Sequence, residues 1–318
     1  MNMIYLCEKE INIRNVYGTQ DIVYRKADIL QNSLRFRDTE YVFSTWGMPV
    51  FSEEEISEYF PALKAVFYAA GSVQQFARPF LNSGVKVFSA WAANAVPVAE
   101  YTVAQIILAN KGFFKTIAYT DWASAGKESK LFPGNYNAKV GIIGAGMIGK
   151  LVIRMLKGYN LEVLTFDPFL SNETAEELGV EKVSLETLFR ECQVVSNHLA
   201  NNAQTIGMLS GALFEKMRPY ATFLNTGRGA QVVEADLIKV LKARPDLTAI
   251  LDVTFPEPPE EGSELYSLPN CILTPHIAGS SGNEVRRMGE CMEAEYQNFI
   301  QNRPCKYEVT LEMLKTMA

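Results

Sequence analysis

The stretch Lys139-Val-Gly-Ile-Ile-Gly-Ala-Gly-Met-Ile-Gly-Lys150 decides the fold of this 318-residue chain. Its apolar first half predicts a strand, its three glycines a tight turn, and the apolar spacing that follows a helix. A second strand pattern, Leu161-Glu-Val-Leu-Thr-Phe-Asp167, ends on an acidic residue. A strand, a Gly-x-Gly-x-x-Gly turn, a helix and a terminal acid in this order form the fingerprint of a dinucleotide-binding βαβ unit.

Each glycine of the fingerprint has its own physical reason. Gly144 permits the tight turn, Gly146 lets the backbone approach a pyrophosphate, and Gly149 lets helix and strand pack closely. The helix start, with Met147 and Ile148, presents free N–H groups and a positive dipole end to the phosphates. The alternative, a structural glycine turn in another α/β protein, leaves the acid at the end of the second strand unexplained.

Asp167 stands where a carboxylate can accept hydrogen bonds from a ribose diol. The same carboxylate would repel a 2′-phosphate, so the sequence favours NAD over NADP as the cofactor. NADP remains an alternative that depends on this one residue.

The composition bounds the class of protein. A hydrophobic content of 48% and a charged content of 21% are typical of globular proteins, and the length predicts two domains. A net charge of −6 without a basic block argues against a nucleic-acid partner. We expect no membrane partner, because no apolar run approaches the roughly 18 residues of a membrane span.

The first ten residues and the cysteines bear on location. Charge begins at Glu8, which is too early for a signal peptide. The five cysteines are odd in number and lack Cys-x-x-Cys spacing, as is typical of reduced packing residues. We therefore expect a cytoplasmic protein. Because the chain has two histidines and no Cys/His cluster, we expect no metal site.

The first hundred residues predict a small parallel α/β unit, in which strand patterns alternate with helical ones. One helix is expected at Ser52–Tyr59, with Ser52 as its cap. Loops without Lys or Arg follow three strands, and parallel sheets bind ligands at such ends, although ordinary turns are the open alternative. The predicted strands are Met3–Cys7, Tyr41–Thr45, Ala65–Ala69 and Val85–Ser89, and the loops are Thr45–Pro49, Ala70–Val73 and Trp91–Asn94.

A long helix is predicted next, at about Val98–Ala118, followed by a polar loop at Ser124–Asn135. We place a domain boundary near residue 100, with this helix crossing it. Beyond Asp167 the β/α alternation resumes and makes about six strands with the fingerprint pair, the size of a doubly wound dinucleotide domain. The predicted strands are Gln193–Asn197, Ala221–Asn225, Thr248–Val253 and Cys271–Thr274.

Helices are expected between these strands at Ser184–Arg190, Ser210–Met217 with Ser210 as cap, and Val233–Ala243. A last helix, Asn283–Gln301, is expected to cross back, so that the C-terminal tail packs on the first domain.

Three strands of the second half run into corners that carry a polar residue. Arg228, between two glycines, offers a planar charged fork for a carboxylate, with a surface salt bridge as the alternative. Glu257, between two prolines, is held stiffly enough to aim at one partner, although it could also be a capping or solvated carboxylate. His276 follows the last strand, where a lone histidine is more often packed than catalytic.

Together these three residues fit one mechanism. A nicotinamide at this sheet edge needs a group that exchanges a proton while C4 exchanges a hydride, and histidine suits this role near neutral pH. A buried Glu257 beside His276 would stabilise the imidazolium. Arg228 would hold a substrate carboxylate and polarise the carbonyl.

At these residues the chain resembles the D-isomer-specific 2-hydroxyacid dehydrogenase family. The resemblance runs in order from about residue 60 to residue 300. Its motifs are the Gly144-x-Gly146-x-x-Gly149 turn with Asp167, the corner Asn225-Thr-Gly-Arg-Gly229, the pair Asp252-Val and Glu257-Pro, and Thr274-Pro-His-Ile-Ala-Gly279. The stretch Asn94–Thr102 also resembles the start of the family's interdomain helix.

The resemblance implies an α/β fold of two domains. A flavodoxin-like substrate domain would comprise residues 1–100 and 285–318, and a central Rossmann-type NAD-binding domain, a doubly wound parallel sheet, would comprise residues 101–284. The active site would lie in the cleft between them. Family members are commonly dimers, so a homodimer through the NAD-binding domain is expected.

The resemblance also assigns roles to residues. It implies Arg228 as substrate binder, His276 as general acid/base and Glu257 as its partner. Residues expected near the cofactor, besides the fingerprint, are Thr226, Asp252, Gly279 and His198, and for His198 a packed structural role is an equal alternative. Residues expected near the substrate, besides Arg228, are Trp46, Gly71, Ser72 and Asn94.

The substrate loop departs from the family pattern. The family usually has Gly-x-Gly-x-Asp, whereas this chain has Ala69-Ala-Gly-Ser-Val73. The loops also offer no cation for a phosphate, so a small or apolar 2-oxo acid is expected in preference to phosphoglycerate.

We expect an NAD-dependent oxidoreductase that interconverts a 2-oxo acid and a D-2-hydroxy acid. The alternative from another class is an NAD(H)-sensing interaction protein, similar to the corepressors that resemble these dehydrogenases.

Overall fold

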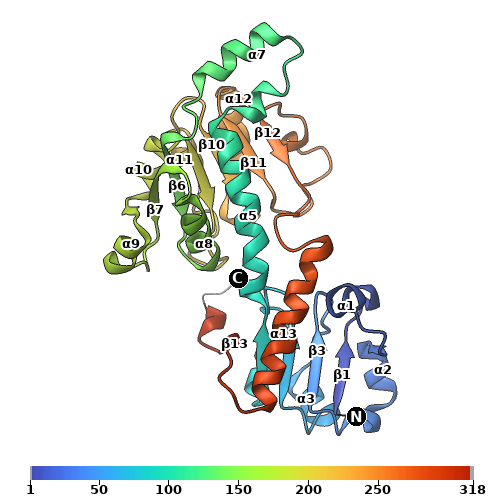
Figure 1. Cartoon of the computed structure of the whole chain (residues 1–318). Coiled ribbons are helices and arrows are strands. Elements are labelled where there is room, and N and C mark those ends of the chain that lie inside the picture. Colours follow the sequence, from blue (N-terminus) through green and yellow to red (C-terminus); the bar gives the residue numbers. More distant parts are fainter. Residues whose placement is uncertain (1, 316–318) are drawn as a thin grey trace. The chain divides into compact units, whose positions relative to one another are not determined.

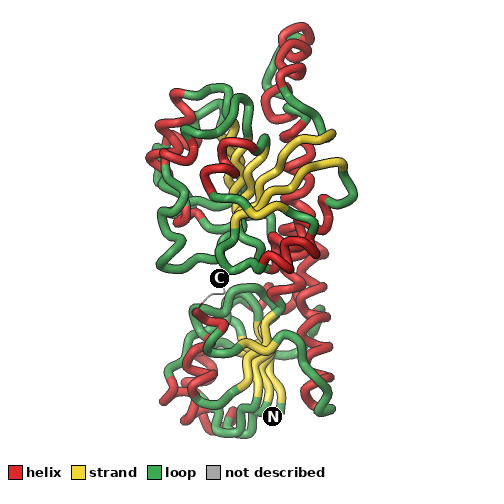
Figure 2. The backbone as a smooth tube through the Cα atoms, turned by 90° about the vertical axis from the view of Figure 1, so that its left-hand side faces the viewer, coloured by secondary structure: helices red, strands yellow, loops and turns green. Residues whose placement is uncertain are grey.

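The computed structural model describes residues 2–315, which form two compact units (Figure 1). Of the described residues, unit 1 comprises 2–95 and 280–315, and unit 2 comprises 96–279. The sequence placed the corresponding limits at residues 100 and 284. Each unit has its own sheet, and Figure 2 shows the strands of each gathered between helices on either side.

The sheet of unit 1 has six strands in the order β13-β5-β4-β3-β1-β2. All neighbours are parallel except β13, which runs antiparallel to β5. The order β2-β1-β3-β4-β5 is that of flavodoxin-like sheets, as predicted. The strands are β1 (Met3–Leu6), β2 (Val23–Tyr24), β3 (Tyr41–Ser44), β4 (Ala65–Tyr68), β5 (Lys86–Ser89) and β13 (Glu308–Val309). The two strands that the sequence missed, β2 and β13, are two residues long, too short for a recognisable pattern.

Alternate residues of these strands face two separate cores. Phe67 on β4 packs with residues of α1 (Glu10–Tyr17) and α13 (Val285–Ile300), whereas its neighbour Val66 packs with residues of α2, α3 and α4. These three helices are α2 (Lys26–Gln31), α3 (Glu53–Tyr59) and α4 (Ala77–Asn82), and the short 3₁₀ turns are η1 (Ser33–Phe36), η5 (Gly282–Glu284) and η6 (Met313–Lys315). Unit 1 is therefore a three-layer sandwich.

Two local predictions for unit 1 are confirmed. Ser52 caps α3, because its hydroxyl accepts from the N–H of Glu55 while the Glu55 carboxylate accepts from the N–H of Ser52. The C-terminal tail, as far as residue 315, packs on unit 1 through the pairing of β13 with β5. Buried Glu295 on α13 fixes the approach to β13, since its carboxylate accepts from the N–H groups of Lys306 and Tyr307.

Helix α5 (Trp91–Asn110) begins in unit 1 and ends in unit 2. The prediction of a helix at Val98–Ala118 was wrong at both ends. Pro97 lies inside the helix instead of before it, and Gly112, with φ +71°, separates α5 from the short α6 (Phe113–Thr116).

By length and composition α5 could cross a membrane, with 20 residues and a mean hydropathy of 1.2, whereas the sequence predicted no such segment. Ala99, Val103 and Ile106 of this helix nevertheless pack in the core of unit 2.

The sheet of unit 2 has seven strands, all parallel, in the order β12-β11-β10-β9-β6-β7-β8. The sequence predicted about six and missed the short edge strand β8. The strand order reverses at β6, between β9 and β7, and doubly wound sheets bind ligands at the carboxyl ends of the strands at such a point. The strands are β6 (Tyr136–Ile143), β7 (Asn160–Phe166), β8 (Glu181–Lys182), β9 (Val194–Asn197), β10 (Thr222–Asn225), β11 (Thr248–Leu251) and β12 (Cys271–Leu273).

Two cores cover the faces of this sheet. One joins α5 to α8 (Met147–Leu156) and α9 (Asn172–Leu178), and the other joins α10 (Leu185–Glu191), α11 (Gly211–Phe214) and α12 (Glu234–Ala243). The 3₁₀ turns are η2 (Ser129–Leu131), η3 (Gly229–Gln231) and η4 (Glu264–Tyr266).

Two local predictions for unit 2 were wrong. The expected helix Ser210–Met217 is the shorter α11, and the N–H of Gly211 donates to the carboxylate of Asp236 and not to the Ser210 hydroxyl. The expected loop at Ser124–Asn135 begins with α7 (Trp122–Glu128), because the Asp121 carboxylate caps it by accepting from the N–H of Ser124.

Candidate active site

The fingerprint turn joins β6 to α8 at the point where the strand order reverses. Gly144 has φ +87°, and a Cβ there would lie 2.8 Å from the carbonyl oxygen of His198. A Cβ on Gly149 would lie 2.0 Å from the carbonyl oxygen of Gly144. Both positions therefore require glycine for the reasons predicted, a tight turn and close packing of the helix on the strand.

Gly146 differs from its two neighbours in the motif, because a Cβ there would meet no atom within 4 Å. The space beside it is open, as a site for an approaching ligand requires. Within residues 2–315, the backbone N–H groups of Gly146, Met147 and Ile148 donate to no protein acceptor. The start of α8 therefore offers unused donors and a positive dipole end, which fit the pyrophosphate of a dinucleotide.

Asp167 directly follows β7, and its carboxylate is tied to the fingerprint turn. One oxygen accepts from the N–H of Ala145 at 2.7 Å, and the other accepts from the N–H of Phe169 at 2.7 Å. These bonds aim the carboxylate, and each oxygen keeps a second lone pair for a ribose hydroxyl. The carboxylate at this strand end can therefore accept hydrogen bonds from a ribose diol.

His198 follows β9 and is 8% exposed. Its Nε2 lies 2.9 Å from the Ser196 hydroxyl and its Nδ1 lies 3.4 Å from the Thr226 hydroxyl. Burial lowers the pKa of His198 to about 3, so its imidazole is neutral. Of the two alternatives, the packed structural histidine fits this geometry, since both ring nitrogens are engaged. Thr226 is buried as well, and its hydroxyl also meets that of Thr102 on α5 at 3.3 Å.

The Arg228 corner packs directly on the backbone before Glu257. A Cβ on Gly229 would lie 2.0 Å from the carbonyl carbon of Thr254, so only glycine allows this approach. Nη1 of Arg228 donates to the carbonyl of Gly227 at 2.8 Å. Burial lowers the pKa of Arg228, and the negative charge of Glu257 opposes this shift. An arginine remains protonated in this setting.

His276 and Glu257 are in direct contact, with Nδ1 of His276 2.6 Å from Oε1 of Glu257. The expectation of a buried Glu257 was wrong, because its side chain is 42% exposed and that of His276 47%. Nε2 of His276 makes no hydrogen bond to a protein group in the part of the chain that the structure describes. The second nitrogen is therefore available to a ligand while the first is held by a carboxylate.

Asp252 follows β11 and is 2% exposed. Its carboxylate accepts from the hydroxyl of Thr274 and from the N–H groups of Ile277 and Ala278. Asp252, which the sequence predicts to lie near the cofactor, bonds the loop that carries His276. Gly279, which is also expected near the cofactor, is the last residue of unit 2.

Thr274 was missed in the sequence as a possible site residue. The only sequence signal was its place in the Thr-Pro-His run after β12, which identifies no bonding partner.

The residues expected near the substrate lie at the carboxyl ends of three adjacent strands of unit 1. Trp46 follows β3 and is 39% exposed, Gly71 and Ser72 follow β4, and Asn94 lies in the first turn of α5 after β5. The Asn94 amide oxygen accepts from the N–H of Ser280 at 3.0 Å, and a Cβ on Gly71 would lie 3.4 Å from its Nδ2. These residues form one edge of unit 1.

The substrate loop keeps its backbone donors. Over the described part of the chain, the N–H groups of Gly71, Ser72 and Val73 donate to no protein acceptor. The Val73 side chain is fully buried in the core, as are Ala69 and Ala70. The replacement of the family's acidic residue by Val73 thus turns a polar position into a packing position.

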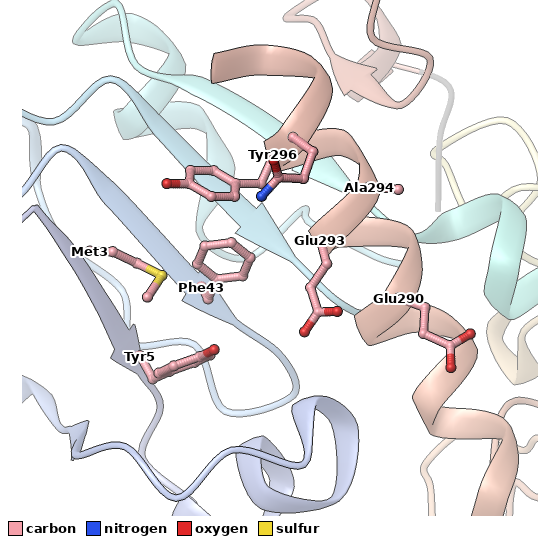
Figure 3. A pocket seen from close by; sticks show the side chains of 8 residues that line it. Met3, Tyr5, Phe43, Glu290, Glu293, Ala294 and Tyr296 are labelled. Atoms are coloured by element: carbon pink, nitrogen blue, oxygen red, sulfur yellow. The ribbon is translucent and has the colours of Figure 1, made fainter. Parts of the chain in front are cut away.

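A surface hollow of about 460 Å³ lies elsewhere on unit 1, between strands β1 and β3 and helix α13 (Figure 3). Aromatic rings form its floor and two carboxylates lie on α13 beside it. Its lining residues, which include none of the candidate site residues, are Met3, Tyr5, Phe43, Glu290, Glu293, Ala294, Tyr296 and Gln297.

Comparisons with known proteins agree with this geometry. Residues 107–278 match the model of the family "D-isomer specific 2-hydroxyacid dehydrogenase, NAD binding domain". The chain is similar to a D-3-phosphoglycerate dehydrogenase of Archaeoglobus fulgidus, with 31% identity over 73% of this chain and 44% of the relative. It is also similar to a glyoxylate reductase of Korarchaeum cryptofilum, with 29% identity over 80% of this chain and 78% of the relative. The chain spans between 36% and 59% of the length of three such relatives.

Among solved structures, the apo form of D-mandelate dehydrogenase from Rhodotorula graminis has a similar fold, with a TM-score of 0.78. The two chains share 20% identity, and the likeness covers 97% of each. The family match takes in the strands from β6 to β12 with the glycine turn, Arg228, Glu257 and His276. The chain therefore belongs to the family of D-isomer specific 2-hydroxyacid dehydrogenases, with NAD as the cofactor of its unit 2.

Proposed function

We propose that this protein interconverts a 2-oxo acid and a D-2-hydroxy acid, with unit 2 binding NAD and unit 1 serving as the substrate domain. The observation that carries the proposal is the His276–Glu257 pair beside Arg228. Nδ1 of His276 is held at 2.6 Å by the Glu257 carboxylate, and Nε2 is left open. The pair stands at the same edge of the sheet as the glycine turn of the NAD fingerprint.

The residues of this chain divide the work among them. The nicotinamide, when bound, supplies or accepts the hydride. His276 gives its Nε2 proton to the carbonyl oxygen of the 2-oxo acid during reduction and takes it back during oxidation. Glu257 accepts from Nδ1–H and stabilises the imidazolium. Arg228 holds the substrate carboxylate with two N–H groups and polarises the carbonyl.

The substrate loop supports a small or apolar 2-oxo acid. The unused N–H groups of Gly71, Ser72 and Val73 are suited to a carboxylate. No Lys or Arg stands in the loops that contain Trp46, Gly71 and Asn94, so a phosphate group would lack a counter-charge. Among the names of the relatives, glyoxylate reductase agrees with this expectation better than phosphoglycerate dehydrogenase does.

The test is NADH oxidation with a broad panel of 2-oxo acids, small, branched and aromatic, with phosphohydroxypyruvate as the phosphorylated member. We expect turnover with at least one unphosphorylated acid and D-configured product. On that substrate, His276→Gln should lower kcat on the order of 10²–10⁴-fold, the usual effect of losing a general acid/base. Glu257→Gln should also lower kcat, whereas Glu260→Gln, which changes an exposed carboxylate of the same loop, should not.

Near-normal turnover of His276→Gln would refute the proton-donor assignment. The alternative of an NAD(H)-sensing interaction protein predicts tight NADH binding without turnover on the whole panel, and none of the relatives reported above supports it.

We also propose that the protein is a cytoplasmic homodimer, joined through unit 2. The segment with α6 and α7 projects from unit 2 (Figures 1 and 2), and its apolar side chains are exposed, with Trp122 93%, Ile117 60% and Phe113 40% exposed. Exposed apolar surface of this kind supports a partner surface, for which a second copy is the simplest occupant. The five free cysteines suit a reducing compartment.

Sedimentation velocity of the wild type and of Trp122→Glu tests the homodimer. We expect a dimer that dissociates in the variant. A monomeric wild type, or a variant that stays dimeric, would refute the proposed interface.

A further inference from the structure

The loop that carries His276 holds this residue in an unusual conformation. His276 has φ +53°, in the left-handed region that residues with a side chain rarely adopt. Such a conformation persists only where the surrounding structure fixes it. The bonds that fix it therefore identify the residues on which the position of the imidazole depends.

Asp252 supplies these bonds from the end of the neighbouring strand β11. Its Oδ1 accepts from the Thr274 hydroxyl at 2.6 Å and from the Ile277 N–H at 2.9 Å, and its Oδ2 accepts from the Ala278 N–H at 2.9 Å. Its backbone carbonyl accepts from the N–H of His276 at 3.0 Å. Because these donors lie before and after His276 in the sequence, the buried carboxylate holds the backbone of the loop on both sides of this residue.

Thr274 connects this carboxylate to helix α5. A threonine hydroxyl has one proton, and here the proton goes to Asp252, because a carboxylate only accepts. In the 3.2 Å contact between the hydroxyls of Tyr101 and Thr274, Tyr101 must therefore donate. The resulting chain of donors runs from Tyr101 through Thr274 to Asp252, entirely within unit 2.

We propose that Thr274 and Tyr101 are positioning residues for His276 that act through Asp252. The proposal rests on the proposed function, in which Nε2 of His276 exchanges a proton with the substrate. Without the Thr274 hydroxyl, Oδ1 of Asp252 accepts only from the N–H of Ile277. The start of the loop at Thr274 then loses its hydrogen bond to Asp252. A displacement of the imidazole by about 1 Å can cost about a hundredfold in rate.

The kinetic test compares Thr274→Val and Tyr101→Phe with the wild type on the best substrate of the panel. We expect kcat to fall roughly ten- to a hundredfold in Thr274→Val and less in Tyr101→Phe, with the KM values for NADH and the 2-oxo acid changed little. Thr274→Ser keeps the hydroxyl and should restore kcat. The matched control is Tyr136→Phe, which removes a hydroxyl from a side chain of the same unit that is 72% exposed. This variant should behave as the wild type.

Nuclear magnetic resonance gives a readout that does not depend on turnover. The chain has two histidines, and His198 is buried and neutral, so the ring ¹⁵N signals of His276 can be assigned by comparison with His276→Gln. We expect these signals to shift or broaden in Thr274→Val and Tyr101→Phe and to return in Thr274→Ser. The proposed function and the positioning role therefore fail separately. A wild type without turnover refutes the function, whereas the His276 signals decide the role.

A double variant tests whether the two residues act as one chain. Because both act on Asp252, the loss of kcat in Tyr101→Phe/Thr274→Val should be smaller than the product of the two single losses. If Thr274→Val does not fold, the isosteric Tyr101→Phe decides alone. The proposal is overturned if a folded Thr274→Val has both the kcat and the His276 signals of the wild type. If Thr274→Val does not fold, the same result in Tyr101→Phe overturns it.

Discussion

His198 makes the stability of unit 2 depend on pH in a way that can be measured. Its imidazole is 8% exposed and contacts the hydroxyls of Ser196 and Thr226. Burial lowers its pKa from 6.5 to about 3 in the folded chain. The unfolded chain therefore binds a proton at this residue in a pH range where the folded chain does not, and acid favours unfolding.

The sign and size follow from this difference. Since the folded-state pKa is lowered, the free energy of unfolding falls as the pH drops below 6.5 and stops falling near pH 3. At pH 5 the unfolded imidazole is about 1.5 pH units below its ordinary pKa, and each unit is worth about 1.4 kcal/mol. His198 should thus cost the wild type about 2 kcal/mol of unfolding free energy between pH 7 and pH 5.

Urea unfolding of the wild type and of His198→Gln, followed by circular dichroism at several pH values from 7 to 5, measures this term. All other ionisable groups are the same in both proteins, so the difference between the two isolates His198. We expect the variant to be less stable at pH 7 but to lose about 2 kcal/mol less on acidification. The same loss in both proteins would refute the assignment of His198 as a buried neutral residue.

Three further predictions concern the cofactor and substrate sites. Asp167→Ala should weaken NADH binding roughly tenfold and leave NADPH binding unchanged or stronger, as measured by fluorescence titration, because it removes a charged acceptor for the ribose diol. Gly149→Ala should lower the unfolding free energy by roughly 1–3 kcal/mol, because its Cβ would lie 2.0 Å from the Gly144 carbonyl oxygen. Gly146→Ala should keep the stability but weaken NADH binding, because a Cβ there meets no protein atom within 4 Å. Thermal unfolding measures the first effect and NADH titration the second. Arg228→Lys should lower kcat/KM for the 2-oxo acid roughly ten- to a hundredfold in steady-state assays, because an ammonium cannot form the planar pair of bonds to a carboxylate.

The sequence alone was sufficient wherever the determining residues are neighbours in the chain. The fingerprint is one βαβ unit, so its glycines, helix start and Asp167 could be assigned from spacing, and the structure gives Gly144 and Gly149 the predicted close contacts. The strands of four or more residues were recognised by their runs of apolar residues. The capping of α3 was recognised from Ser52 and the glutamates that follow it. The family resemblance, confirmed over residues 107–278, rests on the same kind of local motif.

The predictions failed where a partner distant in the sequence decides the local structure. Helix α5 continues through Pro97 because its apolar side chains pack in a core built from distant segments of the chain. Two-residue edge strands exist only because a neighbouring strand supplies their bonds. Spacing along the chain carries no information on such contacts.

At the candidate active site, the sequence identified residue types and the tertiary structure decided their environments. Arg228, Glu257 and His276 stood out because each follows a strand at a rigid corner, yet nothing in the sequence indicated that Glu257 is exposed while His198 is buried. The bond from Asp252 to Thr274 joins the ends of two strands, and the exposure of a side chain depends on every element around it. Periodicity and motifs determine which residues a strand end carries, whereas burial and hydrogen bonding arise only when distant segments pack together.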